Sequence, residues 1–412
     1  MDFSTDGLTD EQQQIRQTCR AVVDEVVIPF IRSDWRREWD MDPDARLAPE
    51  ILATFDEIGV RTLGVPAEYG GVELDPDTEV ATLAMIAEEI ARGDSGLADK
   101  LSQNWKIAVL LRNTAPPHLQ KLWFGRLLED PQFLLAHCLT ESRGASDRWL
   151  PYNVPEAAMQ TRAVRRDGGW VINGSKQFIS NGYDAGLYIV YANTDRGSGV
   201  LQGTSSFLVP RETAGLTIAK CNETLGCRFM NNGELTFEDM WVPEEHLLVE
   251  NDAIGKAGIY FRPGKIMQAA KNLGVGVRAF EVSADYAQNY VQGGAIIIKH
   301  QAVALRLADM AMRIEAVRGL LARAVRAVDA RAPEADALCN MAKVYASEEI
   351  MKVALHAVEL HGGNGMMLEF GVEKLLRDAA IFSHMDATAD ISKFKIIKAM
   401  FPETAGLYAS PA

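Results

Sequence analysis

Residues 170–174 read Trp-Val-Ile-Asn-Gly and residues 187–191 read Leu-Tyr-Ile-Val-Tyr, a texture that sets this part of the chain apart from the rest. Similar short runs lie at residues 205–209 and 234–237. β-Branched and aromatic residues favour strands, and the glycines and asparagines between the runs are typical of turns. The pattern predicts a small antiparallel β-domain, which we place at residues 136–250.

The segments on both sides of this β-domain carry apolar residues at helical spacing. Near the N-terminus, Thr9 supplies a capping hydroxyl, and Asp10 and Glu11 add acidic groups that suit the start of a helix. The chain is therefore predicted to be an α+β multidomain protein, with an N-terminal α-helical domain (1–135), the β-domain, and a C-terminal helical domain (251–412). Further helices are expected at residues 79–92, 95–112, 300–330 and 335–361.

The composition of the 412 residues is that of a globular protein, with 48% hydrophobic and 24% charged residues. These values exclude disorder, collagen-like repeats and coiled coil as the main architecture. There are 42 Lys and Arg against 56 Asp and Glu, which gives a formal net charge of −14. Nucleic acids and anionic membranes select basic surfaces, so neither is expected as a partner.

Five cysteines and seven histidines are present, without the spacing that disulfide frameworks or metal sites require. We therefore expect buried free thiols and no bound metal. The acidic, polar N-terminus is not that of a signal peptide. No apolar run approaches the roughly 20 residues that span a bilayer. A soluble cytoplasmic protein is expected.

The common catalytic motifs are absent: there is no GxGxxG, Walker loop, HExxH or GxSxG. In their place the chain carries, in order, a loop rich in hydroxyls and glycine at residues 139–147, GSKQFISN at 174–181, HGGNG at 361–365 and LRDA at 376–379. Each segment alone is only a weak indication of function.

Taken in order, these segments resemble the FAD-dependent acyl-CoA dehydrogenase family. PAEYGG at residues 66–71 resembles that family's PEEYGG turn, and residues 206–210 and 234–243 resemble its two β-domain signatures. The resemblance runs from Leu8 to about Phe401. It implies a helical domain, an antiparallel β-domain and a C-terminal four-helix bundle, assembled as a homotetramer or dimer of dimers. It also implies an acyl-CoA substrate and an electron-transfer flavoprotein as acceptor.

The same resemblance implies an FAD site between the β-domain and the bundle, with the adenosine end of FAD reaching a neighbouring subunit. Leu139 and Thr140 would contact the isoalloxazine, Phe178 would cover its face, and Ser180 would hydrogen-bond near N5. The remaining residues implied for the cofactor are Gln301, Glu359, Gly362, Gly363 and Thr388, and those implied for the substrate are Ser146, for the pantetheine arm, and Lys265, in place of a common arginine.

Three positions depart from the family's cofactor pattern. Tyr290 replaces an arginine that usually pairs with the FAD pyrophosphate, and Gly293 replaces a phenylalanine. Glu359 stands where a glutamine is common. Charge-assisted phosphate contacts are among the stronger single interactions, so the Tyr290 change should weaken FAD binding or move that contact elsewhere.

The family's GGNG…RDA…YEGT pattern aligns without gaps and places Asp386 at the position of the usual catalytic glutamate. The family's other glutamate position falls at Gly264. Removal of a thioester α-proton needs a carboxylate base and donors for the enolate oxygen. Aspartate keeps this chemistry but is one CH₂ shorter, a loss of roughly 1.5 Å of reach.

Asp99 is the second catalytic candidate, because the resemblance places its helix along the acyl pocket. Two carboxylates beside the acyl group would resemble family members that act on alicyclic acyl-CoAs, so a ring-bearing or branched substrate is expected. The alternative for Asp99 is a solvated helix surface. The alternatives for the whole protein are a flavin oxidase or monooxygenase of this fold, such as a nitroalkane oxidase, and a non-catalytic acyl-CoA-binding scaffold.

Overall fold

The computed structural model describes residues 8–72, 74–144, 146 and 154–402. The chain forms three consecutive blocks, the first mainly helical, the second mainly β and the third mainly helical, as the sequence patterns predict. The main helices are α1 (Asp10–Val22), α2 (Ile28–Ser33), α3 (Pro43–Arg46), α4 (Pro49–Glu57), α5 (Glu79–Gly93), α6 (Ser95–Thr114), α7 (Pro117–Glu129), α8 (Ala253–Lys256), α9 (Gly258–Asn289), α10 (Gln301–Asp329), α11 (Ala335–His361), α12 (Val372–Ile381) and α13 (Ala389–Met400). The strands are β1 (Leu135–Cys138), β2 (Arg162–Arg166), β3 (Gly169–Ile179), β4 (Leu187–Asn193), β5 (Thr204–Pro210), β6 (Leu216–Cys221), β7 (Gly233–Pro243), β8 (Leu247–Val249), β9 (Val291–Gln292) and β10 (Ala295–Ile296).

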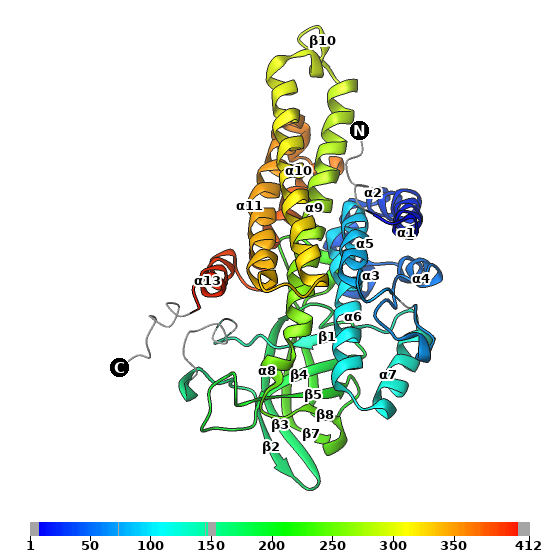
Figure 1. The fold of residues 1–412 in the computed structure, drawn as a ribbon. Coiled ribbons are helices and arrows are strands. Elements are labelled where there is room, and N and C mark those ends of the chain that lie inside the picture. Colours follow the sequence, from blue (N-terminus) through cyan, green and yellow to red (C-terminus); the bar gives the residue numbers. More distant parts are fainter. Residues whose placement is uncertain (1–7, 73, 145, 147–153, 403–412) are drawn as a thin grey trace.

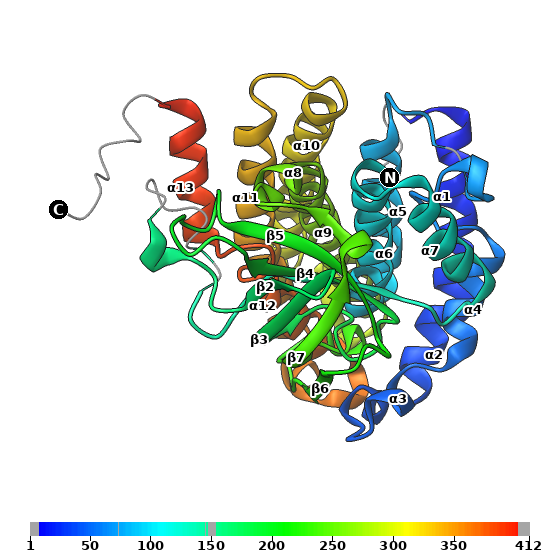
Figure 2. The same ribbon diagram turned by 90° about the horizontal axis from the view of Figure 1, so that it is seen from below.

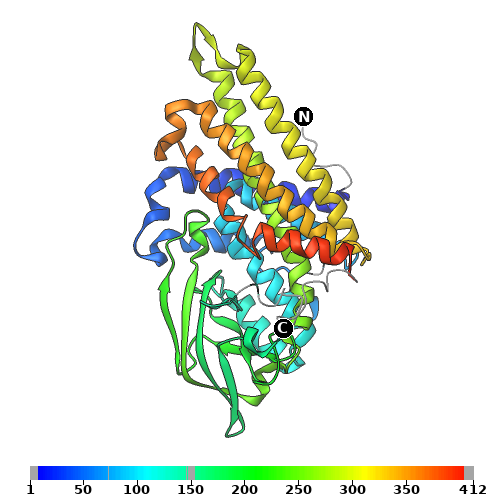
Figure 3. The same ribbon diagram turned by 90° about the vertical axis from the view of Figure 1, so that its left-hand side faces the viewer.

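The long helices α9, α10 and α11 stand side by side, with the β-sheet at one end of them and the β9–β10 hairpin at the other (Figure 1). Helices α1 to α7 cover one side of this body, and α13 packs against α11 at the end nearer the sheet (Figure 3). In the part of the chain that the structure describes, no helix combines the length and the apolar character needed to cross a bilayer.

The predicted helices form with small shifts at their ends. Thr9 caps α1 through a reciprocal capping box with Gln12, as the hydroxyl at this position predicts. Helix α11 covers residues 335–361 as predicted, and α10 is one residue shorter at each end than the predicted 300–330. All five cysteines are free, and four are buried; Cys221 is half-buried.

The sheet has eight strands in the order β6-β7-β3-β2-β4-β5-β8, with β1 also paired to β4 (Figure 2). Most neighbouring strands of this sheet are antiparallel, as predicted, but β1 and β2 both run parallel to β4. β3 follows β2 in sequence and lies between β2 and β7 in the sheet. The other edge of β2 is therefore left to β4, which runs in the same direction. All seven residues of β4 are buried, as in strands covered on both faces.

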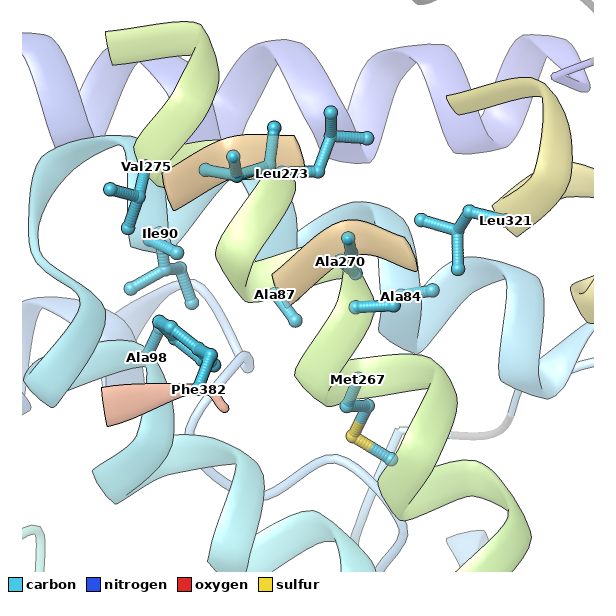
Figure 4. Close-up of a cluster of buried hydrophobic side chains, with 14 of the residues drawn as sticks. Ala84, Ala87, Ile90, Ala98, Met267, Ala270, Leu273, Val275, Leu321 and Phe382 are labelled. Atoms are coloured by element: carbon cyan, nitrogen blue, oxygen red, sulfur yellow. The ribbon is translucent and has the colours of Figure 1, made fainter. Parts of the chain in front are cut away.

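One apolar core joins the N-terminal and C-terminal helices. Ala84, Ala87 and Ile90 of α5 meet Ala270 and Leu273 of α9 in Figure 4. Small side chains on both helices allow close helix packing, so α5 belongs to the bundle in space although it precedes the sheet in sequence. The domain limits at residues 135/136 and 250/251 stay a prediction.

Candidate active site

A cavity of about 420 Å³ opens where the sheet meets α6, α9 and the loop between α12 and α13. Its size lies within the range of roughly 300–1,000 Å³ that is common for ligand sites. Residues more than 240 positions apart in sequence line it together. Seven of the residues proposed from the sequence are among them: Leu139, Thr140, Ser146, Phe178, Ser180, Asp386 and Thr388.

The sheet side of the cavity presents an aromatic ring and hydroxyl groups. Phe178 lies in a bulge of β3 with φ +59°, and its side chain is 62% exposed. The Ser180 hydroxyl donates to Met230 Sδ at 3.0 Å. Lys176 fixes the neighbouring loop that contains Leu139 and Glu141. Its ammonium donates to the Leu139 carbonyl at 3.1 Å and pairs with buried Glu141. An exposed ring on a fixed strand next to hydroxyls suits a flat, polar-edged ligand.

Asp386 enters the cavity from the loop between α12 and α13. Asp386 has φ +51° and Ala387 has φ +87°, a backbone region that residues other than glycine rarely adopt. Two contacts fix this loop: Lys343 Nζ donates to the Ala387 carbonyl at 2.7 Å, and the Thr388 hydroxyl accepts from Ile391 N as the cap of α13. Strained backbone held by its surroundings is common at functional sites.

Cations surround the Asp386 carboxylate. Gln268 Nε2 donates to its Oδ2 at 3.1 Å, and Lys106 Nζ lies 3.7 Å from the same oxygen. Burial alone would raise the pKa of Asp386, but Lys106, Lys265 and Lys271, together with the Gln268 hydrogen bond, outweigh burial and hold the pKa well below its usual range. The carboxyl is therefore ionised at neutral pH, and the same cations make it a weaker base than an ordinary aspartate.

The position of Asp99 corrects the solvated-surface alternative for this residue, and its catalytic role stays a prediction. Its side chain is fully buried, so it is not a solvated helix surface, and it is not among the residues that line the cavity. It forms an ion pair with Lys271 and accepts from Gln268 Nε2 at 3.4 Å. Gln268 thus links the two carboxylates, and Asp99 acts on the cavity through this amide.

Lys265 is also buried and is not among the residues that line this cavity, and its substrate contact stays a prediction. The Gly264 position, in contrast, adjoins the base. A Cβ built there would lie 3.4 Å from Asp386 Oδ2 and 3.9 Å from Lys106 Nζ. A glutamate at position 264 and a glutamate at position 386 could therefore place their carboxylates in the same region of the site.

Comparison with known proteins agrees with this arrangement. Three family models match the chain: the acyl-CoA dehydrogenase N-terminal domain over residues 9–129, the middle domain over 136–240 and the C-terminal domain over 258–401. The chain belongs to the acyl-CoA dehydrogenase family. It is an oxidoreductase that acts on acyl-CoA, and the cofactor of the family is FAD.

The relatives of this acyl-CoA dehydrogenase match it over nearly the whole length. An acyl-CoA dehydrogenase of Bacillus subtilis is 31% identical over 392 residues, which is 95% of this chain and 98% of the relative. A cyclohex-1-ene-1-carbonyl-CoA dehydrogenase of Geobacter metallireducens is 31% identical over 397 residues, 96% and 99% of the two chains. The solved butyryl-CoA dehydrogenase of Megasphaera elsdenii superposes with a TM-score of 0.84 at 28% identity, covering 97% of this chain and 100% of that one.

The residues at the cavity fit the flavin end of this cofactor. The exposed Phe178 ring offers an apolar face, and the Thr140, Ser180 and Thr388 side chains offer hydroxyl groups around it. The Thr388 oxygen already accepts a hydrogen bond, which leaves its O–H free to donate.

The residues implied for the adenosine end lie elsewhere in the acyl-CoA dehydrogenase fold. Gln301 starts α10 after the β9–β10 hairpin and one short 3-10 turn (Ile297–Lys299), at the end of the bundle away from the sheet (Figure 1). Glu359 pairs with Arg306 at 3.3 Å in the same region. Gly362 and Gly363 are exposed. One chain thus separates these residues from the cavity.

Tyr290, which replaces the family's arginine, is part of an aromatic stack at that far end. Its ring lies 4.7 Å from the ring of Tyr286, which in turn lies 4.2 Å from the His361 ring. Asn364 Nδ2 donates to the Tyr286 hydroxyl at 3.1 Å. At this position the charged arginine of the family pattern is replaced by the flat ring of Tyr290, a residue that is 40% exposed.

Several residues at the cavity were missed by sequence reasoning: Gln103, Lys106, His137, Tyr260 and Gln268. A signal was present in the spacing. Asp99, Gln103 and Lys106 follow at helical intervals on α6, and Gln268 and Lys271 do so on α9, so the members of each set lie on one face of their helix. Within the described residues, no group of three or more His, Cys, Asp or Glu side chains could hold a metal ion.

Proposed function

We propose that this acyl-CoA dehydrogenase oxidises the α,β-bond of an acyl-CoA whose acyl group is alicyclic or branched next to the thioester, with Asp386 as the base. The observation that carries the proposal is the Asp386 carboxylate, ionised and exposed to a cavity beside an exposed aromatic ring. The cyclohex-1-ene-1-carbonyl-CoA dehydrogenase relative supports the ring-bearing substrate class.

In this proposal Asp386 takes the α-proton, and its own backbone N–H donates to the thioester oxygen as negative charge develops there. FAD held by the cavity residues would supply the acceptor for the hydride from the β-carbon. Gln268 holds the carboxylate in place, and Lys343 holds the loop that carries it. A fixed base saves the entropy of bringing the reacting groups together.

The shorter reach of aspartate favours a substrate that comes close to the loop. Gly264 has no side chain, and the position adjoins both the Asp386 carboxylate and Lys106. This leaves space beside the base for an acyl group that is wide at its α-carbon. A ring also presents its hydrogens in fixed directions, so a short base needs less freedom to reach them.

The remaining contacts follow from the position of the cavity. We assign Phe178, Ser180, Leu139, Thr140 and Thr388 to the flavin and Ser146 to the pantetheine arm. The adenosine part is assigned to Gln301, Glu359, Gly362 and Gly363 of a neighbouring subunit.

A homotetramer is proposed because α10 and α11 expose apolar side chains that one chain leaves uncovered. Leu305 and Met312 are each 70% exposed, and Leu355 is 46% exposed. Contiguous exposed apolar residues commonly mark subunit contacts. An electron-transfer flavoprotein is the proposed acceptor and the cytoplasm the proposed compartment, both on the family resemblance.

The test is anaerobic titration of the purified flavoprotein with cyclohexanecarboxyl-CoA, butyryl-CoA and octanoyl-CoA, followed by flavin absorbance. Faster and tighter reduction by the ring ester is expected. A clear preference for the linear esters would overturn the alicyclic substrate. Rapid reoxidation by O₂ with ligand bound would favour an oxidase, and protein that cannot be reconstituted with FAD would favour a scaffold.

A further inference from the structure

The cavity wall beside Asp386 carries hydrogen-bonding side chains among its apolar ones. Tyr260 donates from its hydroxyl to Gln103 Oε1 at 2.7 Å, and the His137 ring stacks on Tyr260 with a centroid distance of 4.2 Å. His137 Nε2 lies 3.0 Å from the hydroxyl of Tyr191. Hydrocarbon ligands are usually held by apolar walls, and convergent polar groups fix ligand polar atoms.

Lys106 lies directly behind this wall. Its side chain is fully buried, and its ammonium has no hydrogen-bond partner among the residues that the structure describes. Nζ lies 4.9 Å from the centroid of the Tyr260 ring and 3.7 Å from Asp386 Oδ2, and both of these residues line the cavity. Three N–H donors are thus buried without an acceptor at hydrogen-bonding distance, an arrangement that costs free energy.

A second unpartnered group lies beside it. Gln268 uses its amide nitrogen on the carboxylates of Asp386 and Asp99, while its Oε1 is buried with no partner among the described residues. Gln268 lines the same cavity. Buried polar atoms are nearly always paired in native proteins. The Gln268 oxygen calls for a donor and the Lys106 ammonium for an acceptor, so an acceptor group is missing beside Lys106.

The formal charges point to the same kind of ligand. The buried cluster holds three ammonium groups, Lys106, Lys265 and Lys271, against the two carboxylates of Asp99 and Asp386. Lys271 is paired with Asp99, and Asp386 accepts a hydrogen bond from Gln268 at 3.1 Å. The cluster therefore carries an excess positive charge, and the Lys106 ammonium lies 3.7 Å from Asp386 Oδ2, close enough for an ion pair but too far for a hydrogen bond.

On the basis of the proposed function, we propose that the acyl group carries an oxygen acceptor of its own, as a ring carbonyl or a second carboxylate, and that Lys106 recognises this oxygen. If Lys106 only adjusted the charge of Asp386, its ammonium would stay buried without a hydrogen-bond acceptor. An oxygen atom on the acyl group would supply that acceptor.

The experiment compares the CoA esters of cyclohexanecarboxylate, 4-oxocyclohexanecarboxylate and 4-carboxycyclohexanecarboxylate with the wild-type holoenzyme. We expect kcat/KM for the oxo or the carboxy ester to exceed that for the hydrocarbon ester by at least about 10-fold, because a polar site rejects analogues that leave its groups unpaired. A higher value for the oxo ester identifies a neutral acceptor, and a higher value for the carboxy ester identifies an anionic one. Equal or better turnover of the hydrocarbon ester would overturn the proposal.

The Lys106→Met variant tests the residue itself, since methionine keeps the length of the stem and removes the charge. The ratio of oxygenated to hydrocarbon kcat/KM should fall by about 10- to 100-fold, the range for a lost hydrogen bond to a charged group. The matched control is Lys393→Met, at an exposed lysine of α13 that pairs with Glu348, and it should keep the wild-type ratio. An unchanged ratio in Lys106→Met would contradict the assignment, and the wild-type ratio decides the substrate class even if that variant does not fold.

Failure of this inference differs from failure of the proposed function. If the hydrocarbon ring ester reduces the flavin well and the oxygenated esters do not, the dehydrogenase function stands and the oxygen acceptor is wrong. If no ester of the panel reduces the flavin, the function itself fails.

Discussion

Helix α9 buries two faces that differ completely in chemistry. On one, Met267, Ala270 and Leu273 pack against α5 in the apolar core (Figure 4). On the other, Gln268 and Lys271 are buried to the same degree but contact carboxylates. Apolar burial stabilises the fold by about 1.5–3 kcal/mol per large side chain, whereas buried charges must first recover a desolvation penalty. The apolar face therefore accounts for stability, and the charged face is retained for chemistry.

The largest expected effect is at the end of the charged face. Asp386→Asn should bind flavin and ligand but lower the rate of flavin reduction by about 10²- to 10⁴-fold, because an amide cannot take the proton. Stopped-flow reduction by the preferred acyl-CoA measures the rate. Asp390→Asn, on the exposed start of α13, is the matched control. Near-wild-type reduction in Asp386→Asn would move the base elsewhere, with Asp99 as the next candidate.

Asp386→Glu restores the reach of the family's usual base. We expect the preference to shift toward linear acyl-CoAs, since the longer carboxylate reaches an α-carbon that lies further from the loop. The ratio of butyryl-CoA to cyclohexanecarboxyl-CoA turnover measures this shift. A ratio equal to that of the wild type would mean that reach does not determine the substrate.

Substitutions on the two faces of α9 should separate stability from activity. Leu273→Ala should lower the free energy of unfolding by about 2–5 kcal/mol through the cavity it creates, while turnover per folded enzyme stays high. Asp99→Leu with Lys271→Met removes the buried ion pair as a unit, so stability should change little, whereas turnover should fall because Gln268 loses a partner. Denaturant titration and turnover on the same preparations separate the outcomes. Equal losses of both properties in both variants would remove the distinction between the faces.

Much of this comparison could be predicted from the sequence, and the limit is physical. Helical spacing predicted both ends of α11 correctly. The ordered motifs pointed to Asp386, Phe178, Ser180 and Thr388, all of which line one cavity. The parallel neighbours of β4 were not predicted, because alternation of residue types does not identify the neighbouring strand.

The polar residues behind Asp386 were missed for a related reason. Lys106 and Gln268 lie 280 and 118 positions before Asp386, and only the crossing of α6 and α9 brings them together. On the sequence alone, each is one polar residue on a helix, and such residues are usually solvated.

A smaller effect is expected from the lysine that holds the base loop. Burial, with a contribution from Lys265, lowers the pKa of Lys343 to about 7, against about 10.4 for a free lysine. Between these values the unfolded chain binds a proton that the folded protein does not, so the free energy of unfolding should rise with pH by up to about 1.4 kcal/mol per pH unit. Urea titrations at pH 7, 8 and 9 measure the slope, and Lys343→Met should reduce it. Parallel pH profiles for the two proteins would mean that Lys343 stays charged.

The smallest effect is at Ala387, where the family pattern has glycine. With φ +87°, the alanine Cβ costs about 1–2 kcal/mol relative to a relaxed backbone, while glycine at this position adds entropy to the unfolded chain worth about 0.4–1 kcal/mol. Ala387→Gly should therefore raise the free energy of unfolding by about 0.5–1 kcal/mol. Ala389→Gly, two residues further on in the first turn of α13, should have the opposite sign because its backbone is helical. If both changes destabilise, the loop is not strained at Ala387, and the ordering of Asp386 must come from the Lys343 contact alone.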